Sequence, residues 1–128
     1  MNYLVVMLTL LLGACAPAGG PQVPPQQWGD IQIVVETRPA PLQVGMNEFL
    51  VLATRPHRMP AYDLVVEMRL ADDQPWGQGI QDGNTGVYRK ALAVRDHGPQ
   101  HLQVALRNRH DSALQQRLQF EFPAAVNP

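Results

Sequence analysis

Soft metal donors are the side chains of this 128-residue chain that could most readily do chemistry. His57 and Met59 stand two positions apart in a proline-bounded loop, and His97 and His101 flank a predicted tight turn. Imidazole and thioether groups suit copper. If the two loops met at one end of the fold, these four residues would form a copper site. The alternative is that the histidines are solvated, and Met68 fits a buried strand face, where methionine is usually core filler.

Nucleophilic catalysis is not predicted. Ser112 is the only serine and Cys15 the only cysteine. His110, Asp111 and Ser112 supply the residue types of a hydrolase triad, but three adjacent residues cannot take the geometry in which Asp orients His and His contacts Ser. The stretch predicts a polar turn, and we expect that the protein is not an enzyme.

The first residues predict a secretory signal. Residues 4–12 form an apolar run of nine, which is shorter than the ~20 residues of a membrane span but typical of a signal's apolar core. The run ends in Leu12-Gly13-Ala14-Cys15, which resembles the lipobox of bacterial lipoproteins. That resemblance implies attachment of a diacylglycerol to the Cys15 thiol, cleavage before Cys15, acylation of the new amine with chains such as palmitate, and anchoring in a lipid bilayer. Ala16 implies the inner leaflet of the outer membrane, facing the periplasm. A short buried element and an uncleaved anchor are the alternatives.

A proline-rich segment follows the cysteine. Residues 16–27 contain four prolines and two glycines, a composition that favours extended polyproline conformations over regular elements. We therefore divide the chain into a signal at 1–14, a lipidated cysteine with its tether at 15–27, and one folded domain at 28–128.

The rest of the chain predicts strands. Apolar and polar residues alternate with period two, the mark of a strand with one wet face, and turn-forming residues separate the runs. No stretch has a convincing helical stripe. We expect an all-β fold, a single immunoglobulin-like sandwich of about six or seven antiparallel strands. Trp76 and the spacing Gly77-x-Gly79-x-x-x-Gly83 are placed in a long flexible loop. The six alternating runs are residues 30–37, 46–54, 62–70, 87–94, 101–107 and 114–122.

One segment carries a further resemblance. Pro41-Leu42-Gln43-Val44-Gly45-Met46-Asn47-Glu48-Phe49-Leu50-Val51 is similar to the YtkA-like domains, which are related to FixH. The resemblance covers about residues 30–107. It implies a small periplasmic or extracellular immunoglobulin-like sandwich, with Gly45 and Gly86 in turns and Tyr88 in packing. The association of FixH with oxidase assembly implies a copper role as an alternative function. The other matching segments are 63–70, 86–92 and 98–106.

The charge balance of the chain limits the classes of partner that it can bind. The chain has 10 Lys and Arg against 11 Asp and Glu, whereas a nucleic-acid binder normally has a strong basic excess. Residues 28–86 hold 8 acids and 4 bases, and residues 87–128 hold 3 acids and 6 bases. This asymmetry gives either a mixed solvated surface or a face that docks a partner. We expect a lipid-anchored periplasmic module that is accessory to an envelope complex, with an unidentified envelope protein as its partner. The alternative is a periplasmic copper-binding protein or metallochaperone.

Overall fold

Alternating burial defines the strands of this protein. In β2 (Ile31–Arg38), Ile31, Ile33, Val35 and Thr37 are buried, and the residues between them are exposed or half-buried. The computed structural model describes residues 23–128, and no helix among them is long and apolar enough to cross a membrane. The other strands are β1 (Gln26–Trp28), β3 (Gly45–Arg55), β4 (Met59–Pro60), β5 (Leu64–Arg69), β6 (Gly77–Gln78), β7 (Ile80–Gln81), β8 (Val87–Val94), β9 (Gln100–Asn108) and β10 (Gln115–Phe122), with a short 3-10 turn, η1 (Pro56–Arg58), between β3 and β4.

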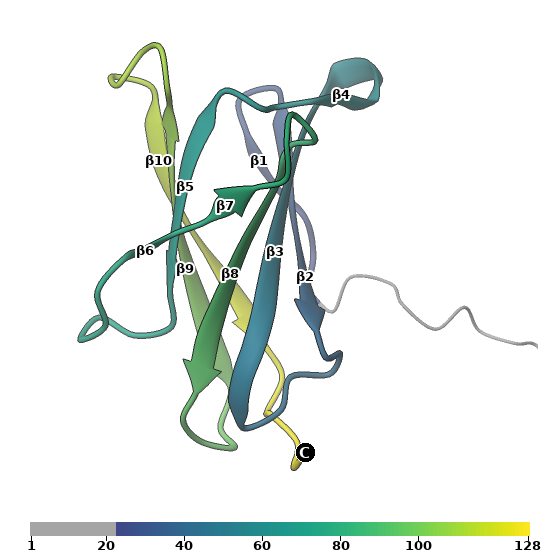
Figure 1. The fold of residues 1–128 in the computed structure, drawn as a ribbon, viewed down its shortest axis with the longest axis vertical. Helices are drawn as coiled ribbons and strands as arrows, with labels where there is room; N and C mark the ends of the chain where they lie inside the picture. Colours follow the sequence, from purple (N-terminus) through teal and green to yellow (C-terminus); the bar gives the residue numbers. More distant parts are fainter. Residues whose placement is uncertain (1–22) are drawn as a thin grey trace, which may run out of the picture.

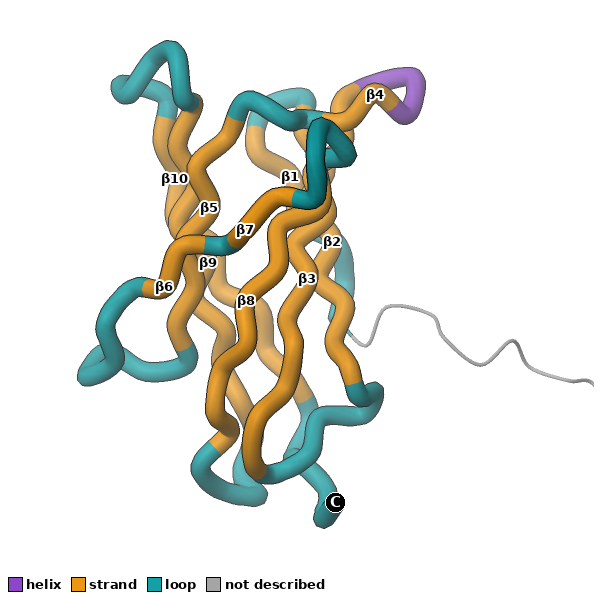
Figure 2. The backbone as a smooth tube through the Cα atoms, viewed as in Figure 1, coloured by secondary structure: helices purple, strands orange, loops and turns teal. Residues whose placement is uncertain are grey.

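Two antiparallel sheets face each other (Figure 1). One has the order β1-β2-β3-β8-β7, with β4 paired to the end of β3, and the other has the order β10-β9-β5-β6. The strands β2, β3, β8 and β7 follow the order of the ABED sheet of an immunoglobulin domain, and β5, β9 and β10 follow its CFG sheet. The predicted all-β, immunoglobulin-like sandwich is therefore confirmed. All six predicted strands are present, and four short strands add to them (Figure 2).

The core lies between the sheets. Phe49 of β3 and Phe122 of β10 meet edge to face across it, with ring centroids 5.9 Å apart. Met68 is fully buried, as expected for a methionine that fills core space. Tyr88 is the largest of the fully buried side chains, in agreement with the packing role that the family resemblance implies for it.

The segment from Gly77 to Gln81 crosses from one sheet to the other. Its first half, β6, pairs with β5, and its second half, β7, pairs with β8. Gly79 lies at the crossing, where its N–H donates to the Val66 carbonyl at 2.7 Å. A Cβ there would stand 3.1 Å from the Met68 side chain. The predicted flexible loop at 77–83 is therefore wrong for residues 77–81, because β6, Gly79 and β7 form backbone hydrogen bonds with the sheets.

The sandwich begins earlier than expected. Val23 is 3% exposed and belongs to the core cluster, and Gln26 pairs with Ile33 of β2. Residues 23–27, which composition assigns to the tether, are thus part of the folded domain. A single apolar residue such as Val23 can enter a core even when prolines surround it. The proline-rich composition of the segment gives no sign of this burial. The predicted signal and Cys15 lie outside the described residues.

Candidate functional site

The predicted copper ligands do not meet. His57 and Met59 follow the end of β3 that contains Arg55, whereas His97 follows the end of β8 that pairs with Gly45. The eleven residues of β3 separate these ends by about 33 Å at ~3.3 Å per residue. The condition for a joint site, that the two loops meet at one end of the sandwich, is not fulfilled.

The histidine environments are also separate. The Nδ1 atom of His97 lies 3.4 Å from the Ala125 carbonyl oxygen, and that of His101 lies 3.8 Å from the Glu121 carboxylate. His57 is exposed in a left-handed backbone conformation, with φ of 62°. Within residues 23–128, no three His, Cys, Asp or Glu side chains group so that they could hold a metal ion.

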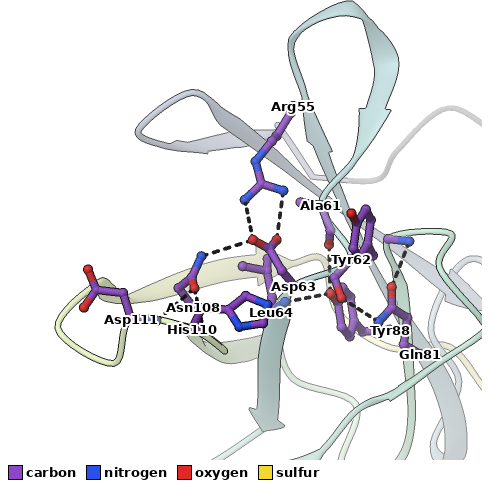
Figure 3. A network of polar contacts seen from close by, with 11 residues as sticks. Arg55, Ala61, Tyr62, Asp63, Leu64, Gln81, Tyr88, Asn108, His110 and Asp111 are labelled. Atoms are coloured by element: carbon purple, nitrogen blue, oxygen red, sulfur yellow. Dashed lines mark hydrogen bonds and ion pairs between the residues drawn. The ribbon is translucent and has the colours of Figure 1, made fainter.

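A polar network clamps the loops at the η1 end of the sandwich (Figure 3). The Arg55 guanidinium donates two hydrogen bonds to the Asp63 carboxylate, at 2.8 and 3.1 Å, and Asn108 donates a third at 3.3 Å. Hydrogen bonding from Arg55 holds the pKa of Asp63 below its usual value. The backbone N–H groups of His110 and Asp111 donate to the Asn108 side chain, so this stretch forms the predicted polar turn.

Tyr88 extends the clamp into the core. Its hydroxyl donates to the Ala61 carbonyl at 2.8 Å and accepts from the Leu64 N–H at 3.2 Å (Figure 3). Burial raises the pKa of this phenol above its usual value. The contacts of Asp63 and Tyr88 join different elements of the sandwich, so the network holds the fold rather than presenting a reactive group.

The outer face of the four-stranded sheet has a different character. Its cross-strand partners form three outward rows, which run from β10 through β9 to β5. An open groove of about 460 Å³ lies over this face. It is hollowed because Ala105, in the central row, has only a methyl group between larger neighbours. We call it the Trp76 groove and define it by six of its lining residues: Val65, Glu67, Trp76, Ala105, Arg107 and Arg117.

Trp76 is held over the sheet by arginine. The Arg69 guanidinium carbon lies 4.3 Å from the centre of the indole ring, and that of Arg117 lies 5.4 Å from it. These distances are within the range of cation–π attraction. Arg69 is fixed in turn, because its Nε donates to the Gln103 side chain at 2.9 Å and its guanidinium pairs with Asp72 at 3.5 Å. A rigid side chain of the sheet thus positions an aromatic residue of the β5–β6 loop.

The two arginines that line the groove itself have a different role from Arg69. Arg107 and Arg117 are both exposed, and in the part of the chain that the structure describes neither forms a salt bridge or a side-chain hydrogen bond. They occupy diagonal positions on the paired strands β9 and β10, a spacing that long side chains can bridge. A stacked guanidinium keeps its in-plane N–H donors free. The face therefore presents exposed cationic donors to solvent.

Sequence reasoning located the strands of this site but missed the site itself. The outward positions of β9 and β10 are rich in Arg and Gln, which as a pattern only indicates a wet sheet face. The sequence predicts a loop at Trp76 and no contact for its side chain. What the sequence could not show is that the β5–β6 loop folds back over the sheet. Comparison of the chain with protein-family models, with curated proteins and with solved structures finds no match.

Proposed function

We propose that this chain is a lipid-anchored envelope protein whose sandwich is a binding module, with the Trp76 groove as its binding face. The observation that carries the binding role is Trp76, fixed by Arg69 beside two arginines that form no salt bridge or side-chain hydrogen bond within residues 23–128. Aromatic and arginine side chains with limited freedom are the usual anchors of protein interfaces. The network at the η1 end, by contrast, satisfies its own polar groups internally.

The anchor half of the proposal is supported by the sequence. Leu12-Gly13-Ala14-Cys15 and the apolar run before it favour acylation of Cys15, and Ala16 favours the inner leaflet of the outer membrane. The similarity of residues 41–51 to YtkA-like domains favours a periplasmic location. We expect Cys15→Ser to abolish lipid labelling and to leave the signal uncut by the lipoprotein peptidase. Normal processing and release of that variant would contradict the anchor.

The binding half is tested by photocrosslinking in cells. A photoreactive amino acid replaces Gln115, which lies at the groove and is exposed, and in a matched variant replaces Gln32, which is exposed on the outer face of the other sheet. We expect one discrete adduct from position 115, lost with Trp76→Ala, and none from position 32. Equal adducts from both positions, or none from 115, would refute the groove as the binding face.

The copper alternative receives no support from the arrangement of its donors. His57 and Met59 lie at one end of the sandwich, and His97 and His101 lie toward the other. We therefore do not extend the proposal to metal transfer.

A further inference from the structure

The chemistry of the Trp76 groove specifies its ligand. We infer that the groove binds an extended, acidic segment of a protein partner, with carboxylates of that segment held by Arg107 and Arg117. This inference rests on the proposed binding function and adds the class of ligand to it.

Charge complementarity is the first argument. Arg107 and Arg117 carry two positive charges, and Glu67 is the single carboxylate among the six residues that define the groove. The charge of Arg69 is already paired with Asp72. The planar fork of a guanidinium matches a carboxylate, with two parallel N–H donors to its two oxygens. An excess of unpaired guanidinium therefore selects an anionic ligand over a neutral one.

The shape and lining of the groove are the second argument. Its floor contains Val65 and Ala105, which can cover apolar parts of a ligand, and the amide of Gln115 stands at its rim. Amide side chains both donate and accept hydrogen bonds, as a peptide backbone requires. The combination of an apolar floor, amides and guanidinium groups fits an extended peptide with carboxylate side chains.

Trp76 argues against a sugar as the ligand. Sugar recognition by stacking requires a bare aromatic face, and here two guanidinium carbons already lie over the indole ring, at 4.3 and 5.4 Å. The indole ring is thus in contact with the protein's own arginines. The chain's own N-terminal segment is also a poor occupant, because residues 1–22 contain no Asp or Glu.

The test measures peptide binding to the full chain in a neutral detergent. The probe is a fluorescent peptide of about ten residues, long enough to span the face when extended, in which glutamate alternates with threonine. Its matched control replaces every glutamate with glutamine. We expect the glutamate peptide to bind at least fivefold more tightly, and Arg117→Gln or Arg107→Gln to remove most of this preference. Arg38→Gln, which removes an exposed arginine from the other sheet, should leave binding unchanged.

The outcomes separate the inference from the proposed function. Equal affinity for the two peptides, or no binding of either up to about 1 mM, would overturn the acidic-peptide inference, whereas the crosslink at position 115 reports on the groove as a binding face. Tighter binding of a chitin oligosaccharide than of the glutamate peptide would also overturn it. If dimerisation at the groove competed with the peptide, gel filtration would show a second copy as the occupant, and the inference would again be wrong.

Discussion

Gly86 is where the sequence constrains the fold most sharply, and Gly86→Ala tests this. The residue precedes β8 with φ of +73°, and its carbonyl accepts a hydrogen bond from the Ala53 N–H at 2.9 Å. A Cβ would stand 2.6 Å from the Ala53 carbonyl oxygen, 3.1 Å from Pro60 and 3.2 Å from the Ala61 nitrogen. Two of these atoms are backbone, so relief requires a shift of β3 or of the residues after β4.

A matched variant, Gly83→Ala, separates the cost of the steric contacts of a new Cβ from the cost of the left-handed backbone conformation. Gly83 also has positive φ, +56°, but a Cβ there would meet nothing within 4 Å. The left-handed conformation costs a non-glycine residue about 1–2 kcal/mol, partly offset by the lower entropy of the unfolded chain. We expect Gly83→Ala to cost about 1 kcal/mol. Gly86→Ala adds overpacking of about 1–3 kcal/mol, for a total of about 2–4 kcal/mol.

The assay is urea unfolding of both variants, followed by circular dichroism. If the dependence of the unfolding free energy on urea concentration is unchanged and only the midpoint urea concentration falls, the substitution has changed stability alone. A thermal scan gives an independent value, since 1 kcal/mol shifts the midpoint of a domain of this size by about 4–8 °C. If Gly86→Ala cost no more than Gly83→Ala, the close approach of Gly86 to Ala53 would not constrain the fold, and the reasoning would be refuted.

Three further predictions follow from the clamp and the groove. Tyr88→Phe should cost about 1–3 kcal/mol in urea unfolding, because it leaves a buried carbonyl and a buried N–H without their partner; a neutral effect would mean that water replaces the hydroxyl. The pKa of Asp63 is lowered by its hydrogen bonds from Arg55, so its contribution to stability is complete above about pH 4 and is lost as the pH falls further. Asp63→Asn should reduce this loss of stability at acidic pH. An unchanged loss of stability in the variant would contradict the role given to Asp63. Arg69→Met should free the loop that carries Trp76, seen as loss of the near-UV circular dichroism of that indole, while the far-UV spectrum stays constant.

The strands were predictable because one physical signal specifies them. A strand with one wet face must alternate, and all six predicted runs fall within two residues of the observed strands at each end. The short strands β6 and β7 were not predicted, since two residues are too few to show a period. Their pairing depends on Gly79, whose small size lets the chain pass between Met68 and the Tyr88 side chain. This close packing of Gly79 against Met68 and Tyr88 depends on the tertiary structure, which the local sequence pattern does not show.

The site was less predictable than the fold for a related reason. His57, Met59, His97 and His101 have the right chemistry for copper, but only the topology of β3 and β8 decides which loops share an end of the sandwich. Conversely, Arg107 and Arg117 look like ordinary solvated residues in the sequence. They become a site through Ala105, which lies opposite Arg117 and next to Arg107 on the same face, and through a loop that returns over the sheet.

Pairing between strands that are far apart in sequence also affects how fast this protein folds. The β9–β10 and β2–β3 pairs are neighbours in sequence, but the contact between Arg69 and Gln103 joins residues 34 positions apart, and that between Glu48 and Arg89 joins residues 41 apart. Closing such loops costs entropy before any contact rewards it, so sandwiches of this kind fold in milliseconds to seconds. Until β5 pairs with β9 and β8 pairs with β3, the backbone N–H and C=O groups along these strand edges lack their partners. Unpaired strand edges can pair with other chains, so the protein is most prone to intermolecular mispairing during this interval.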